Sequence, residues 1–366
     1  MSIDTQTILI QLVILLACFA MPLAILPGLI WGERRVAAWI QLRSGPNRVG
    51  PFGLMQPLAD VIKLVFKEDV IPNRADRTLF TIAPIFAFVP GMVGLAVVPM
   101  GPGFYWEGQY LAFQGADIGV GILFLLAMVG ITAYALTFGG WASNSKFPQL
   151  GGIRATAQVI SYEIALGLAF LSVIIVASDP AIGISGFRLT DVVWDQVRTG
   201  VPGDYTAATF LGFLPNWNMF TQPLAFVIFV IAAFAEANRA PFDLPEAEPE
   251  LVGGFHTEYS SFKFAMFFMG EYLAVILQSC LIVILFMGGW HVIGMPIEAK
   301  DGLEGIAWTI VGFAVFMAKV SAVIFFFMWV RWSLPRFRYD QLMNLGWKIL
   351  IPLALLNLIL VAIFSI

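Results

Sequence analysis

Long apolar stretches constrain the fold of this chain more than any other feature of its sequence. Eight stretches are long enough to cross a lipid bilayer, and they lie near residues 7–31, 78–99, 115–139, 153–177, 218–237, 262–287, 306–331 and 345–365. A helix needs about 20 apolar residues to cross roughly 30 Å of hydrocarbon. With 59% hydrophobic and only 12% charged residues, the chain cannot cover a soluble core with a polar surface. The sequence therefore predicts an integral membrane protein.

The apolar stretches are expected to be helices. Backbone polar groups in hydrocarbon must be satisfied within the segment, and the stretches lack the alternation of barrel strands. We expect an all-α polytopic protein with about eight transmembrane helices, forming a single membrane domain over residues 1–366. Residues 53–68 are shorter, and their apolar side chains recur at helical spacing with Asp60, Lys63 and Lys67 on the other face. This pattern predicts an amphipathic interfacial helix on the cytoplasmic side, although a passive membrane anchor would have the same pattern.

The distribution of basic residues predicts the orientation of the chain. Most of the 20 Lys and Arg lie in the connections after the first, third, fifth and seventh spans or at the adjoining span ends. Connections rich in Lys and Arg stay in the cytoplasm. Both termini are then expected on the outer side of the membrane.

The sequence offers no cofactor ligands of the common kinds. Its two cysteines, Cys18 and Cys280, fall inside spans and cannot supply the four thiolates of an iron–sulfur cluster. His256 and His291 lie on opposite sides of the membrane, so a two-histidine metal site is not expected. No GxGxxG or P-loop string indicates nucleotide binding. We expect no metal, flavin or cluster on this chain, and no nucleic acid among its partners.

An acidic loop connects the fifth and sixth spans, between Ala235 and Glu258. Its acidic residues are opposed by Arg239 and are Glu236, Asp243, Glu246, Glu248, Glu250 and Glu258. Such a cluster attracts protons, metal cations or a basic partner. A solvated acidic loop is the plainer interpretation, but the apolar segments around Pro241 and Pro245 favour a loop that is packed against the protein.

Three ionisable residues fall near the middle of predicted spans: Glu163, Glu271 and Lys319. Each ionised group there costs about 2.5–3.5 kcal/mol on insertion scales, so these groups must pair, share protons or face water. Glu236 lies between the acidic loop and the two buried glutamates. The arrangement predicts a path for protons or ions from the cytoplasmic surface toward the membrane centre. A structural Glu–Lys pair that locks the helices together is the alternative.

Several long strings resemble one known family. They are ERR at 33–35, QLRSGPN at 41–47, QPLAD at 56–60, QVISYE at 158–163, PFDL at 241–244, EAEPEL at 246–251 and LPRFRYDQLM at 334–343. Over nearly the whole chain the sequence resembles the membrane subunit called H in bacteria, or subunit 1 in mitochondria, of the proton-pumping NADH:quinone oxidoreductase, respiratory complex I. It departs from the family pattern at Ala247, at His256 and in the long connection 178–217.

The resemblance implies three groups of functional residues. The residues that would line or support a quinone path are Glu33, Arg34, Gln41, Arg43 and Asp60. The charged loop facing the quinone chamber would contain Arg239, Asp243, Glu246, Glu248, Glu250 and Glu258. The proton path would use Glu163, Glu236 and Glu271, with Lys319 as their ionic partner.

The resemblance also implies what the chain works with. Its substrate would be a quinone, ubiquinone or menaquinone, reduced by clusters in other subunits, so that no complete active site lies on this chain alone. Its partners would be a peripheral arm that contains flavin and iron–sulfur clusters, the antiporter-like membrane subunits, and lipid. The location would be the bacterial cytoplasmic (inner) membrane, with both termini periplasmic.

Three other functions remain open at this stage. A homologous subunit of a membrane-bound hydrogenase-type complex would share the helices and the buried acids, but it need not keep a quinone chamber. A stand-alone ion transporter is a second alternative, and broken helices in two corresponding halves would indicate it. A structural anchor for a peripheral arm is the third.

Overall fold

The computed structural model describes residues 5–178, 186–197, 209–210, 214–245, 252–292, 295 and 300–364. Regular structure in these residues is almost entirely helical. The helices are α1 (Thr5–Ile40), η1 (Pro51–Gly53), α2 (Gln56–Phe66), α3 (Arg77–Val97), α4 (Gly121–Ala142), α5 (Lys146–Ala177), α6 (Leu189–Val197), α7 (Asn218–Thr221), α8 (Pro223–Glu236), η2 (Gly254–His256), α10 (Ser261–Phe286), α11 (Gly302–Ser333), α12 (Tyr339–Asn344), the π-helical η3 (Leu345–Leu350) and α13 (Ile351–Phe364). The strands are β1 (Phe104–Trp106), β2 (Gln109–Leu111), β3 (Thr209–Phe210) and β4 (Leu214–Pro215).

The all-α polytopic fold is confirmed. Within the described residues, 7 helical segments are long and apolar enough to cross a membrane, the last of them running without interruption from α12 to α13. The fifth predicted span is shorter than expected, because it divides into α7 and the 14-residue α8. The division falls at Gln222 and Pro223; proline has no N–H to continue a helix but fits the first turn of a new one.

Two helices extend into segments that we expected to be connections. Helix α1 continues to Ile40, so Glu33 and Arg34 belong to its last turns instead of to a surface segment. Helix α5 already begins at Lys146, inside the compact loop expected before Arg154. In both places the charged residues are good helix formers, which allows the helix to continue past the apolar stretch.

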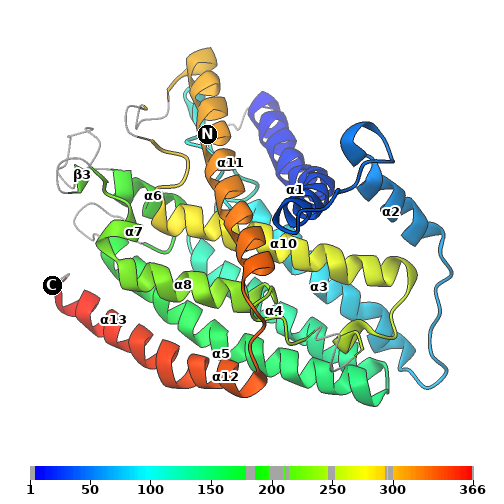
Figure 1. Ribbon diagram of the computed structural model, residues 1–366. Coiled ribbons are helices and arrows are strands. Elements are labelled where there is room, and N and C mark those ends of the chain that lie inside the picture. The colour runs from blue at the N-terminus through cyan, green and yellow to red at the C-terminus, as the bar shows by residue number, and fades with distance from the viewer. Residues whose placement is uncertain are drawn as a thin grey trace.

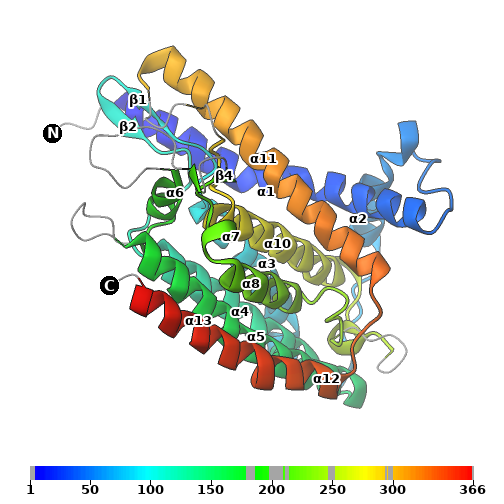
Figure 2. The ribbon, with the colours of Figure 1, turned by 60° about the vertical axis from the view of Figure 1, so that its left-hand side comes forward.

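Helix α10 forms the centre of the bundle. It is the most buried of the seven long segments, whereas α1 and α12–α13 are the least buried. Figure 2 shows α1 and α11 along one side and α13 along the opposite side, with α3, α4, α5, α8 and α10 between them. Glycine allows the central helices to approach closely: a Cβ at Gly270 of α10 would lie 2.6 Å from the carbonyl oxygen of Ala87 in α3.

The two ends of the bundle differ in structure. The beginning of α1 and the end of α13 lie at the same end, together with α6 and the β1–β2 hairpin (Figures 1 and 2). The hairpin is antiparallel, with Phe104 opposite Leu111, and turns through Glu107 and Gly108 at positive φ. Helices α2 and α12 lie at the other end, where the acidic loop leaves α8. Large apolar side chains of α2, including Leu58 and Ile62, are exposed.

Candidate functional site

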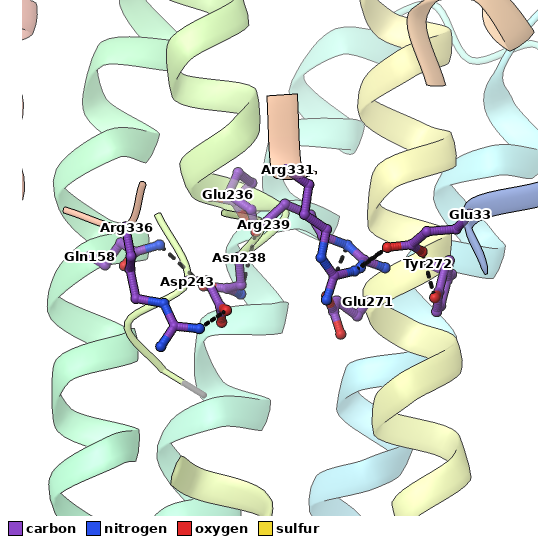
Figure 3. Close-up of polar contacts among 10 residues, drawn as sticks. All are labelled: Glu33, Gln158, Glu236, Asn238, Arg239, Asp243, Glu271, Tyr272, Arg331 and Arg336. Carbon is purple, nitrogen blue, oxygen red and sulfur yellow. Dashed lines mark hydrogen bonds and ion pairs between the residues drawn. The ribbon is translucent and has the colours of Figure 1, made fainter. Parts of the chain in front are cut away.

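Glu33 near the end of α1 is the meeting point of four segments. Its Oε1 accepts hydrogen bonds from Arg239 Nη1 at 3.3 Å and from Arg331 Nη1, and its Oε2 accepts one from the Tyr272 hydroxyl at 2.6 Å. Arg239 follows α8, Tyr272 belongs to α10 and Arg331 to α11. Figure 3 shows these side chains converging on the Glu33 carboxylate, which is buried.

Arg239 joins this group to the membrane glutamate Glu271. Its Nε lies 2.9 Å from Glu271 Oε1, and its guanidinium stacks 4.3 Å from the centre of the Tyr272 ring. Burial by itself would lower the pKa of Arg239, but the carboxylates of Glu271 and Glu33 outweigh burial and raise it. We call Glu33, Arg239, Glu271 and Arg331 the ionic cluster. Its two cations balance its two anions, which allows the charges to remain buried.

A cavity of about 60 Å³ extends from the acidic loop to two of the predicted proton-path residues. Glu236 and Glu271 both line it, as do Asn238 and His256 of the loop. The remaining walls are mainly phenylalanine and alanine side chains of α3, α4, the loop and α10. A site needs about 10–15 Å³ to hold one water molecule, so this cavity has room for several.

Glu236, Glu271 and Glu163 lie close together on neighbouring helices. Glu236 ends α8 and is buried, and its Oε1 accepts a hydrogen bond from the Thr132 hydroxyl at 3.5 Å. Glu163 of α5 is near enough to repel Glu236 electrostatically. It faces Gly130 of α4, where a Cβ would lie only 2.8 Å from Glu163 Oε1. The structure thus brings together the three carboxylates that the sequence placed on one path.

The first part of the acidic loop is held firmly against the helices. The Gln158 side chain of α5 donates from Nε2 to the carbonyl oxygens of Ala235 at 2.8 Å and Phe242 at 2.7 Å. Asp243 accepts from Arg336 at 2.8 Å (Figure 3). The loop therefore has a defined conformation next to Glu236.

The remaining acidic residues of the loop add little to this site. Glu258 is half-buried at the far end of the loop. The predicted chamber-facing residues Glu246, Glu248 and Glu250 lie outside the described residues.

The other residues predicted for a quinone path lie at the connection between α1 and α2. Arg34 Nη1 is 2.8 Å from Asp60 Oδ2, which ties α1 to α2. Beyond the end of α1, Arg43 donates from Nε to Gln41 Oε1 at 2.7 Å, and both side chains are exposed. These four residues form the surface approach to Glu33 and do not belong to the ionic cluster.

Lys319 is a correction to the sequence analysis. Its Nζ donates to the carbonyl oxygens of Met287 at 2.6 Å, Gly289 at 3.0 Å and His291 at 2.8 Å, and lies 4.4 Å from the Trp217 ring centre. The expected ion pair with the buried glutamates is therefore wrong. The carbonyls at a helix C-terminus lack helical partners and form the negative end of the helix dipole, so a cation is stabilised there.

Three residues that contact the site were not among the predicted site residues: Gln158, Tyr272 and Arg331. Tyr272 and Arg331 stand within family-like strings, and Arg331 is a charge at the end of an apolar span, which was the signal available. Gln158 has no comparable signal, because a single amide in a span is compatible with many packing roles.

The fold and the site define a polytopic membrane protein in which buried charges on several helices connect one membrane surface to the interior. Within the described residues, no group of three or more His, Cys, Asp or Glu side chains is placed to hold a metal ion. The sequence model of the NADH dehydrogenase family matches residues 10–362. The chain therefore belongs to the NADH dehydrogenase family.

Curated relatives narrow the position within this family, and each is the NADH-quinone oxidoreductase membrane subunit designated H. The one from Geobacter metallireducens, designated H 1, is 46% identical over 341 residues, covering 93% of this chain and 92% of the relative. The one from Cytophaga hutchinsonii, also designated H 1, is 42% identical over 360 residues, covering 98% of each chain. The one from Thermomicrobium roseum is 43% identical over 355 residues, covering 97% of this chain and 96% of the relative. The similarity thus extends over the whole membrane bundle.

Proposed function

We propose that this chain is the quinone-site and proton-path subunit of a proton-translocating NADH:quinone oxidoreductase. Its substrate is a quinone, ubiquinone or menaquinone, reduced by iron–sulfur clusters in a peripheral arm that also contains flavin. Antiporter-like membrane subunits are its partners in the membrane. It resides in the bacterial inner membrane with both termini periplasmic. The names of its relatives support the class of enzyme, and the ionic cluster supports the role of this subunit within it.

One observation supports the coupling role above all: Arg239 contacts both Glu33 and Glu271. Glu33 lies next to the predicted quinone approach at α1 and α2, whereas Glu271 lines the cavity that also contains Glu236. Two unit charges 4 Å apart interact by about 4 kcal/mol at an effective dielectric constant near 20. A charge that appears or disappears on the quinone side of Arg239 can therefore change which carboxylate holds a proton on the other side.

The acidic loop would transmit the same change mechanically. Gln158 holds both ends of the segment from Ala235 to Phe242, so Glu236 and Arg239 move as one unit with α5. Glu163 lies on the same helix, five residues beyond Gln158. A displacement of this loop on quinone reduction would thus be passed to Glu163 as well as to Glu236.

The test is the effect of Glu163→Gln and Glu236→Gln in the assembled complex. Amide side chains keep the shape but cannot exchange a proton, so we expect proton translocation in proteoliposomes to fall by about tenfold or more, within the range for loss of a positioned proton-transfer group. Glu304→Gln is the matched control, because Glu304 is exposed and pairs with Lys300 near the beginning of α11. Wild-type rates of both quinone reduction and proton translocation in the two variants would refute the proposed path.

Purification distinguishes the proposal from the other candidate functions. The chain should be isolated in mild detergent with subunits that contain flavin and iron–sulfur clusters and that oxidise NADH. A chain that purifies alone and moves protons in liposomes would instead be a transporter. A complex that oxidises hydrogen and lacks flavin would be of the hydrogenase type.

A further inference from the structure

Two buried oxygen atoms without hydrogen-bond partners face one small cavity. They are Glu236 Oε2 and Gln278 Oε1, and neither has a donor among the described residues. Glu236 is 5% exposed and Gln278 only 1%. Both side chains line a cavity of about 20 Å³ that is separate from the larger one beside the acidic loop. Neither oxygen is used by the contacts of the ionic cluster.

The cavity follows from the sequence of α10. Gln278 lies seven residues after Glu271, which is two helical turns, so the two side chains share a face about 10 Å apart along the axis. Between them, Gly270 and Ala274 line the cavity and are too small to fill it. Pro90 of α3 forms part of the opposite wall and has no N–H to offer.

The two cavities meet at Glu236. Both are lined by Glu236 and Thr132, together with Ala87, Gly270 and Ala274. The Thr132 hydroxyl already donates to the Val129 carbonyl oxygen at 2.6 Å, and its contact with Glu236 Oε1 is long at 3.5 Å. The polar lining of the smaller cavity therefore contains acceptors that need a donor from elsewhere.

We propose that one ordered water molecule occupies this cavity and bridges Gln278 Oε1 to Glu236 Oε2. A volume of about 20 Å³ exceeds the 10–15 Å³ that one water needs and is too small for a second. A water has two O–H donors, which match the two oxygens that lack partners. Buried polar groups are nearly always satisfied by protein or by ordered water, and this site is polar enough and large enough for water.

The bridging water gives Gln278 a role in positioning Glu236. With Thr132 on Oε1 and the water on Oε2, both oxygens of the carboxylate are held in place. The water also extends the hydrogen-bonded path from Glu236 toward the interior along α10. This second role depends on the proposed proton path, whereas the water site itself does not.

The direct test is a cryo-EM structure of the assembled complex at a resolution that shows ordered waters. Density is expected between Gln278 and Glu236 in the wild type and should be lost in Gln278→Leu. Ser279→Ala is the matched control, since Ser279 is equally buried but its hydroxyl donates within its own helix to the Val275 carbonyl oxygen. An empty cavity in a wild-type map that shows other buried waters would overturn the site, as would a protein donor bound to either oxygen.

A second measurement reports on Glu236 itself. The infrared carboxyl band that Glu236→Gln abolishes should shift in Gln278→Leu and keep its wild-type frequency in Ser279→Ala. Proton translocation should fall by about tenfold in Gln278→Leu, as expected for a lost hydrogen bond to a charged group. An unshifted band would overturn the bridge to Glu236. If the water and the band shift are present but Glu163→Gln and Glu236→Gln translocate normally, the proposed function fails and the water site stands.

Discussion

At the scale of single residues, the charge of Arg239 decides whether the ionic cluster can remain buried. Arg239 contacts Glu33 and Glu271, and its replacement would leave two anions opposite the single cation Arg331. Removing one partner of a buried ion pair typically costs about 3–5 kcal/mol, because the other charge stays buried without compensation. Arg239 is thus a structural requirement of the site as well as a candidate for coupling.

We therefore predict that Arg239→Met lowers the stability of the chain by about 3–5 kcal/mol and reduces its amount in the membrane. Unfolding in detergent and quantitative immunoblotting measure the two effects. The double variant Arg239→Met with Glu271→Gln restores the charge balance and should recover much of the loss. Equal instability of the single and the double variant would show that packing, not charge, explains the effect.

At the scale of elements, Lys319 joins α11 to the end of α10. Its ammonium group satisfies carbonyl oxygens that no helical N–H reaches, and it lies over the ring of Trp217. The neighbouring His291 is also buried, and burial lowers its pKa, with the positive charge of Lys319 acting in the same direction. A second cation is thus disfavoured at this end of α10, which leaves Lys319 as the group that caps it.

Lys319→Met should accordingly reduce stability without uncoupling the complex. Each buried carbonyl that loses its donor costs about 1–3 kcal/mol, so the apparent melting temperature should fall measurably. The number of protons translocated per quinone reduced should remain at the wild-type value in whatever complex assembles. A normal melting temperature combined with lost translocation would instead place Lys319 on the proton path.

At the scale of the whole molecule, charge is distributed unequally between the two ends of the bundle. The basic side chains around α2, the start of α3, the start of α5 and α12 lie at one end, and the end of α13 lies at the other (Figure 2). Positive-inside orientation then places the α2 end in the cytoplasm. The ionic cluster would face the cytoplasmic arm of the complex.

This orientation predicts the behaviour of reporter fusions. Alkaline phosphatase fused to either terminus should be active, because the enzyme folds only in the oxidising periplasm. A fusion placed in the connection between α4 and α5 should be inactive and serves as the matched control. Activity of that internal fusion, with inactive terminal fusions, would reverse the proposed orientation.

Much of the candidate site could be predicted from local sequence. Glu163, Glu236 and Glu271 stand out because ionisable residues in apolar spans are costly, and the structure does bring them together. Their partners could not be predicted in the same way. Lys319 and Arg239 were both possible counter-ions, and the choice depends on where α10 ends and on how the loop after α8 folds back.

Taken alone, the sequence determined the solvent, the helical class and the approximate spans, because hydrophobic length and periodicity are local properties. Only the tertiary structure decided that α1 continues far enough to bury Glu33 and that Glu33 meets Arg331, 298 positions away in the chain. It also decided that Glu236 and Gln278 share a cavity. Contacts between distant segments depend on helix packing and loop geometry, which no local pattern specifies.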